Sequence, residues 1–165
     1  MFSVFKNINR FAGKYKLLDV FAIFCAKYLL YVMLVFLFFI AAKMHSRGIF
    51  FYPLLSGMSG AFVINTIIYF FYKKHRPAEL KSTKTLIQVP ETPSFPSRHS
   101  ALTFGVSFYL FFYSTELAVI FIICSCFVGL ARVFCGVHWF LDILGGVVSG
   151  LIASIIVYNL VILIR

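Results

Sequence analysis

The chain has 165 residues, of which 62% are hydrophobic and 12% are charged, and its formal net charge is +10. A soluble domain carries about 25% charged residues, so this chain could not cover a water-exposed surface, and one domain over residues 1–165 is expected in a bilayer. A basic chain often binds nucleic acid, but this chain is too apolar for that class of protein. Anionic lipid is the better partner for its positive charge.

The first sixteen residues predict an amphipathic helix on the membrane surface. Apolar side chains recur there at helical spacing, and basic side chains occupy the other face: Phe2, Phe5, Ile8, Phe11 and Ala12 against Lys6, Arg10 and Lys14. Two apolar runs follow, Leu17–Ala42 and Gly48–Tyr72, and each is long enough for a membrane helix of ~20 residues.

Residues 73–97 break the helical pattern, since they hold four of the five prolines and five basic residues. This segment must leave the hydrocarbon or line a polar cavity. The runs Ala101–Tyr113 and Leu117–Ala131 are short for spans, and we expect them to cross only if their polar flanks are recessed in a pocket. The last helix is predicted over His138–Ile164, with Gly146 and Gly150 at a helix-packing spacing.

These elements predict an all-α, polytopic membrane bundle of about five transmembrane helices and one interfacial helix. With five spans, the 73–97 loop and the 132–137 loop lie on the same side of the membrane as the N-terminus. Three polar groups therefore come together there: residues 73–77, 96–99 and 132–142.

His138 and Asp142 are the most informative residues of the last helix. Their i, i+4 spacing places them on one helix face, and an ionised Asp within an apolar helix needs a partner. A carboxylate bonded to one ring nitrogen would leave the other free as a base or nucleophile. A structural polar pair that locks the helix is the alternative.

The basic residues around this pair suit a phosphate group, because guanidinium forks match phosphate oxygens. Arg76, Arg98 and Arg132 are the candidates, and Ser97 would add a hydroxyl at a helix start. His99 suits a general acid, since it has no acidic neighbour in sequence. Headgroup anchoring is the alternative for any single arginine.

A zinc site formed by His99, His138 and Asp142 is a competing interpretation. Three surrounding arginines would repel a dication, so we expect neither metal nor cofactor.

The sequence resembles the type 2 phosphatidic acid phosphatase superfamily in three blocks. The first is Lys, six residues, Arg-Pro, matched by Arg76-Pro77, although Tyr69 stands at the Lys position. The second is Pro-Ser-Gly-His, which reads Pro96-Ser97-Arg98-His99. The third is Ser-Arg, five residues, His, three residues, Asp, which reads Ala131-Arg132, His138 and Asp142.

The resemblance implies that His138 forms a phosphohistidine, that Asp142 orients it and that His99 protonates the leaving group. It also implies that Arg76, Ser97 and Arg132 hold the phosphate without a metal. Since the family Lys is missing, we expect one of three cations to replace it: Lys73, Lys74 or Arg98.

The predicted function is hydrolysis of a phosphate monoester or diphosphate of an anionic membrane lipid. The blocks look most like those of small bacterial undecaprenyl-diphosphate phosphatases. Lipid A 1-phosphatases and phosphatidylglycerophosphate or phosphatidate phosphatases share them. Two alternatives belong to other functional classes: a non-catalytic lipid or anion transporter, and a structural membrane protein.

The expected location is the bacterial inner membrane, with the active site on the periplasmic side. The periplasmic side is what the resemblance implies. The positive-inside rule points the other way, because the excess of Lys and Arg would make the active-site end cytoplasmic. On the opposite side we expect only three Lys and Arg residues: Lys43, Arg47 and Arg165.

Overall fold

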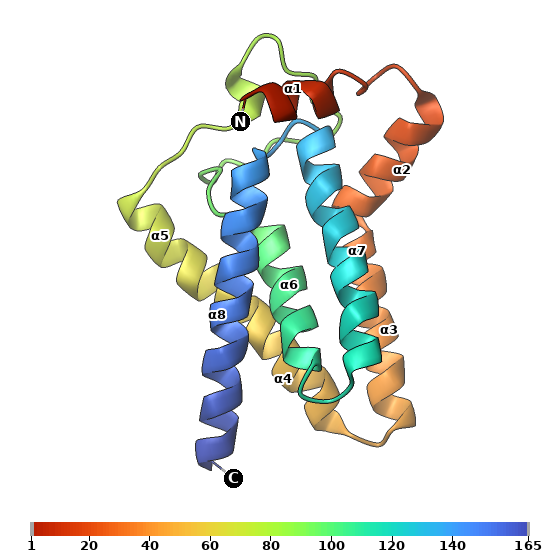
Figure 1. Ribbon diagram of the computed structural model, residues 1–165, viewed down its shortest axis with the longest axis vertical. Helices are drawn as coiled ribbons and strands as arrows, with labels where there is room; N and C mark the ends of the chain where they lie inside the picture. The colour runs from red at the N-terminus through yellow and green to blue at the C-terminus, as the bar shows by residue number, and fades with distance from the viewer. Residues whose placement is uncertain (1, 165) are drawn as a thin grey trace.

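The computed structural model describes residues 2–164, and every regular element among them is helical, which confirms the all-α prediction (Figure 1). In chain order these elements are α1 (Phe2–Asn9), α2 (Lys16–Lys27), α3 (Leu29–Lys43), α4 (Arg47–Met58), the π-helical turn η1 (Ser59–Ile64), α5 (Asn65–Phe71), the 3-10 turn η2 (Pro77–Glu79), α6 (Arg98–Leu110), α7 (Thr115–Phe134) and α8 (Phe140–Ile164).

Three helical segments of the described chain are long and apolar enough to cross a membrane: Arg47–Phe71, α7 and α8. A fourth span forms if α2 and α3 count as one helix, bent by 53° at Tyr28. The fifth expected span is α6, whose 13 residues extend roughly 20 Å, less than the thickness of a bilayer core. The chain crosses the bilayer several times, and it does so around a short internal helix.

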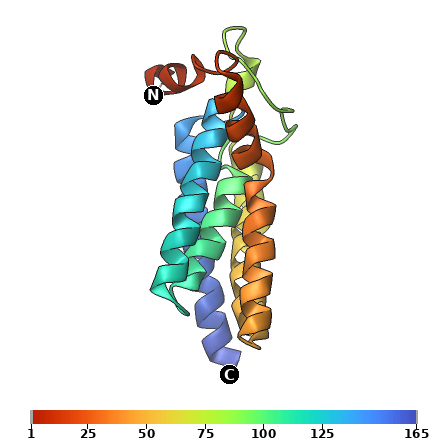
Figure 2. The ribbon, with the colours of Figure 1, turned by 90° about the vertical axis from the view of Figure 1, so that its right-hand side faces the viewer.

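Helix α6 lies at the centre of the bundle, with α4, α7 and α8 around it (Figures 1 and 2). Small residues let the backbones approach closely, as the sequence predicts. A Cβ atom added to Gly150 would lie 2.6 Å from the backbone nitrogen of Gly105, and one added to Gly57 would lie 2.5 Å from the carbonyl oxygen of Leu102. Because α6 is buried on all sides, its polar first turn can end inside the protein.

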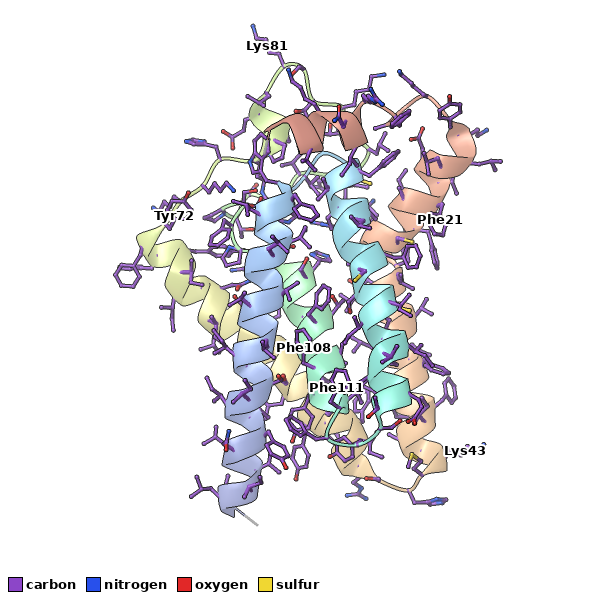
Figure 3. The ribbon with its side chains drawn as sticks, in the orientation of Figure 1. Phe21, Lys43, Tyr72, Lys81, Phe108 and Phe111 are labelled. Atoms are coloured by element: carbon purple, nitrogen blue, oxygen red, sulfur yellow. The ribbon has the colours of Figure 1, made fainter. Side chains whose placement is uncertain are left out.

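The outer faces of the helices are apolar, as expected for contact with lipid. Phe70 and Phe71 of α5 and Leu163 of α8 are each more than 80% exposed. Many other aromatic and aliphatic side chains point outward along the bundle (Figure 3). Bilayer rather than water is therefore the solvent of this surface.

Helix α1 lies across one end of the bundle (Figures 1 and 2). Phe5 and Ala12 are buried against the protein, and Asn9 fixes the segment by bonds from its Nδ2 atom to the carbonyl oxygens of Lys84 and Phe134, at 2.8 and 2.9 Å. Ile8 is half-buried and Phe11 is exposed, and the side chain of Phe2 lies outside the described part of the chain.

The described residues confirm the predicted arrangement of the loops at the two ends of the bundle. The 73–97 loop lies at the same end as α1, whereas the α3–α4 and α6–α7 turns lie at the other (Figure 1). Figure 3 shows Lys81 and Lys43 at these opposite ends. Arg165, which the sequence places with Lys43, lies outside the described residues.

Candidate active site

A cavity of about 410 Å³ lies between the bundle helices and the 73–97 loop. Five of the predicted site residues line it: Arg76, Arg98, His99, Arg132 and His138. The rest of the lining is mainly apolar and comes from α3, η1, α5 and α6: Leu30, Tyr31, Leu34, Ala61, Phe62, Tyr69 and Leu102, with Pro90 and Thr92 of the long loop. The cavity thus joins a cationic, imidazole-bearing end to a hydrophobic wall.

His138 has its two ring nitrogens in different environments, and this assigns its tautomer. Nδ1 lies 3.0 Å from the carbonyl oxygen of Ser94, which only accepts, so Nδ1 carries the proton. Nε2 lies 3.3 Å from Nη1 of Arg76, which only donates, so Nε2 presents its lone pair. Burial lowers the pKa of His138 to about 4, a shift that Asp142 opposes and that Arg132 and Arg76 reinforce, so the imidazole is neutral at pH 7.

Asp142 does not make the predicted hydrogen bond to His138, since its Oδ2 atom lies 3.6 Å from Nδ1. The two side chains still lie in ion-pair range, as their i, i+4 spacing predicts, although α8 begins at Phe140 and His138 precedes it. Asp142 instead accepts bonds from the backbone nitrogen of Trp139 at 2.8 Å, from Lys74 Nζ at 2.7 Å and from the hydroxyl of Ser94.

Ser94 therefore links Asp142 to His138, since its hydroxyl donates to the carboxylate while its carbonyl oxygen accepts from the ring. Sequence reasoning missed this residue, because a lone Ser in a Pro-rich loop carries no signal of its own. Its position between Pro93 and the Pro96-Ser97 block is the only available hint.

Arg76 is 5% exposed and uses all five of its N–H donors within the protein. Besides the contact with His138, Nη1 donates to the carbonyl oxygen of Val137 at 2.7 Å and Nε to that of Thr92 at 2.9 Å. Nη2 donates to Thr92 Oγ1 at 3.2 Å and to the carbonyl oxygen of Pro93 at 3.1 Å. Arg76 thus ties the 73–97 loop to the loop between α7 and α8, with Nη1 beside His138 Nε2.

Arg132 is 4% exposed, yet most of its donors are free. Nη1 lies 3.4 Å from the carbonyl oxygen of Ala26, whereas Nε and Nη2 are buried with no hydrogen-bond partner among residues 2–164. Unsatisfied buried donors cost free energy, and an anion in the cavity would satisfy them. His99 lies in the same group, where Arg132, His138 and Arg76 act on it electrostatically.

The remaining predicted phosphate ligands lie away from the cavity. Ser97 is buried and caps α6, its Oγ accepting from the backbone nitrogen of Ser100 at 3.4 Å. Lys74 is paired with Asp142, and Lys73 is exposed on the rim of a separate cavity of about 520 Å³ that is lined mainly by the long loop. Of the three cations expected to replace the missing Lys, only Arg98 lines this cavity, and the structure therefore favours Arg98 over Lys73 and Lys74.

The zinc alternative required His99, His138 and Asp142 to converge. In the described part of the chain no three His, Cys, Asp or Glu side chains form a group that could hold a metal ion. Asp142 is already bonded to Lys74, Ser94 and Trp139.

Fold and site together define a multi-pass membrane protein with an anion site made of arginine and histidine. The family model for the PAP2 superfamily matches residues 49–164, and the chain belongs to this superfamily. Its members include membrane lipid phosphatases, and this chain is a phosphatase of that kind with a lipid substrate.

Two relatives are similar over most of the chain. The bacitracin transport permease protein BcrC of Bacillus licheniformis is 25% identical over 157 residues, covering 93% of this chain and 77% of its own. The undecaprenyl-diphosphatase BcrC of Bacillus subtilis strain 168 is 25% identical over 160 residues, covering 96% and 82%.

Two solved structures share the fold. LpxE of Aquifex aeolicus has a TM-score of 0.73 at 27% identity, covering 96% of this chain and 94% of its own. A PAP2-type phosphatidylglycerolphosphate phosphatase from Bacillus subtilis has a TM-score of 0.66 at 19% identity, covering 99% and 87%.

Proposed function

We propose that the protein removes the terminal phosphate from a lipid diphosphate, undecaprenyl diphosphate in the first place, through a phosphohistidine on His138. The observation that carries the proposal is that His138, with Nε2 unprotonated, lines the same cavity as Arg132, whose Nε and Nη2 atoms have no partner among residues 2–164. A neutral imidazole beside unpartnered guanidinium donors is the arrangement that nucleophilic attack on phosphorus needs.

In the first step His138 Nε2 attacks the terminal phosphorus, and the bond from phosphorus to the leaving oxygen breaks. The leaving oxygen keeps the electron pair and takes a proton from His99, which becomes protonated once the phosphate anion lies beside it. Arg132 binds the equatorial oxygens, where negative charge accumulates, and the Nη1 N–H of Arg76 joins it when the attacking Nε2 atom no longer accepts from it. The Nδ1 proton stays on His138, held by the carbonyl oxygen of Ser94.

In the second step water attacks the phosphohistidine. His99, now neutral, accepts a proton from that water, and inorganic phosphate leaves as the Nε2 lone pair is restored. Asp142 lies 3.6 Å from Nδ1 and stabilises positive charge on the ring during both steps.

The substrate assignment rests on the relative named undecaprenyl-diphosphatase, at 25% identity. Lipid A and phosphatidylglycerophosphate or phosphatidate are the alternatives; LpxE at 27% identity supports a lipid phosphatase more generally. We place the protein in the bacterial inner membrane with the active site on the periplasmic face.

A transporter is the second candidate, and one relative is named a transport permease. The described cations of the cavity all lie at one end of the bundle, next to a nucleophile that transport would not require. This favours hydrolysis.

Release of inorganic phosphate by purified protein tests the proposal, with undecaprenyl diphosphate, phosphatidylglycerophosphate, phosphatidate and lipid A as substrates. We expect turnover in EDTA, inhibition by vanadate and fastest release from undecaprenyl diphosphate. Faster release from another lipid would reassign the substrate, and no release from any of the four by monodisperse protein would contradict the proposal.

A further inference from the structure

Arg98 stands where the family has Gly, and it differs from the other two arginines in its surroundings. Its guanidinium carbon lies 5.0 Å from the ring centroid of Tyr69 and 5.6 Å from that of Phe62. None of the ion pairs among residues 2–164 includes Arg98, and its Nε atom is buried without a hydrogen-bond partner. Arg98 thus packs against two aromatic rings and keeps its Nε donor without a partner in the described chain.

The Tyr69 ring is a fixed support for this arginine. Its hydroxyl donates a 2.6 Å hydrogen bond to the carbonyl oxygen of Pro96, and the side chain is 7% exposed. Tyr69 occupies the position of the family Lys, so the sequence has exchanged a Lys and a Gly for a Tyr and an Arg that touch each other. A cation therefore remains in the cavity, but it enters from α6 instead of α5.

The cavity has a deep end and a rim. His138 and Arg132 are 2% and 4% exposed and mark the deep end. Phe62 and Tyr31 are 50% and 62% exposed on the lipid-facing surface and mark the rim. Arg98 packs on Phe62 at the rim and lines the same cavity as His138 and Arg132, so it lies between the deep end and the rim.

We infer that Arg98, supported by Tyr69, binds the second, lipid-proximal phosphate of a diphosphate substrate, and that the site is thereby selective for lipid diphosphates over lipid monophosphates. The inference rests on the proposed function. A terminal phosphate that reaches His138 directs the lipid toward Leu30, Tyr31, Leu34 and Phe62 of the same cavity. The second phosphate of a diphosphate then lies between His138 and these apolar residues, beside Arg98.

Charge supports the same assignment. The described lining of the cavity includes three arginines and no Asp or Glu. A diphosphate monoester has one more ionisable oxygen than a phosphate monoester, so it matches a third guanidinium better. During the reaction the bond from the terminal phosphorus to the bridging oxygen breaks, and Arg98 holds the lipid monophosphate that leaves.

The test compares farnesyl diphosphate with farnesyl phosphate, which have the same tail, in detergent micelles. We expect wild-type protein to show a higher kcat/KM for the diphosphate. Arg98→Gln should lower kcat/KM for the diphosphate by at least about tenfold more than for the monophosphate, and Arg98→Lys should recover part of this difference. Arg132→Gln should impair both substrates, and Lys81→Gln, an exposed loop cation at the same end, is the matched control.

Equal losses of kcat/KM for both substrates in Arg98→Gln and Arg98→Lys would overturn the inference, because Arg98 would then bind the phosphate that reacts. Wild-type kcat/KM values for both substrates in both variants would overturn it too, because Arg98 would then bind neither phosphate. Wild-type protein that hydrolyses only the monophosphate would refute this inference and leave the lipid phosphatase intact, whereas protein that hydrolyses neither would refute both.

Discussion

At the residue scale, the two buried arginines of the site contribute to stability in opposite directions. Arg76 donates five hydrogen bonds that join two loops, whereas Arg132 keeps Nε and Nη2 buried without partners. A buried hydrogen bond contributes about 1 kcal/mol, and an uncompensated buried charge costs free energy. We therefore expect Arg132 to lower stability, as a group that serves the proposed site would.

We predict that Arg76→Gln lowers the melting temperature in detergent, with a loss of roughly 2–4 kcal/mol of unfolding free energy. Arg132→Gln should leave the melting temperature unchanged or raise it, because it removes a charge with unsatisfied donors. Both variants should lose most of their phosphate release. Differential scanning fluorimetry of the two variants beside wild type measures this contrast, and a larger drop for Arg132→Gln than for Arg76→Gln would contradict it.

Sequence patterns predicted the chemistry-bearing residues of the cavity but not their hydrogen bonds. The spacing of Arg132, His138 and Asp142 indicated a site, and two of these residues, Arg132 and His138, line the cavity with Arg76, Arg98 and His99. His138 and Asp142 do lie in ion-pair range, with 3.6 Å between Nδ1 and Oδ2, but the bond that fixes the ring is donated to the carbonyl oxygen of Ser94. The role of Ser94 depends on the path of the long loop, which no periodic pattern encodes.

At the element scale, α6 owes its central place to glycines on its neighbours. Gly150 of α8 faces the backbone nitrogen of Gly105 so closely that an added Cβ would lie 2.6 Å away, and Gly146 would bring a Cβ to 2.7 Å from the carbonyl oxygen of Ser97. Since α6 begins with Arg98 and His99, its docking on α8 also positions the site.

We predict that Gly150→Ala destabilises the protein by about 1–3 kcal/mol, because backbone atoms cannot yield as a flexible side chain would. Activity should fall with it, as the α6 first turn shifts. The matched control is Val148→Ala on the lipid-facing side of the same helix, where the side chain is 56% exposed. Thermal unfolding of the two variants in the same detergent provides the measurement, and equal melting temperatures would argue against close packing of α6 on α8.

Helix existence was predictable and helix length was not. Hydropathy indicated each apolar run, yet Leu117–Ala131 becomes the longer α7, Thr115–Phe134, because the hydroxyl of Ser114 caps its start and buried Arg132 lies in its last turn. The run Ala101–Tyr113 becomes α6, which starts at Arg98 and ends at Leu110. At the site end both helices extend to polar residues that the protein partly or fully buries, Arg98 in α6 and Arg132 in α7.

At the scale of the whole molecule, the orientation in the membrane follows from which end carries the site. Lys81 lies at the active-site end and Lys43 at the other, and both side chains are exposed (Figure 3). The basic excess at the active-site end would by itself make that end cytoplasmic. We attribute the excess to binding of anionic headgroups and keep the periplasmic assignment.

We predict that Lys81→Cys, in a chain whose four native cysteines are replaced by alanine, reacts in intact cells with a membrane-impermeant thiol reagent. Lys43→Cys should react only after the cells are permeabilised. The reverse pattern would place the active site in the cytoplasm and overturn the assigned orientation. Phosphate release by each variant in detergent shows that the labelled protein is folded.

The central claim is that His138 becomes phosphorylated during turnover, and trapping the phosphoenzyme tests it most directly. Protein mixed with lipid diphosphate and quenched in alkali should carry one phosphoryl group, labile to acid, on the peptide that contains His138. Asp142→Asn should form it more slowly, because the ring loses a nearby carboxylate, and His138→Ala should form none. A phosphoryl group on another residue, or phosphate release at the wild-type rate by His138→Ala, would contradict the account.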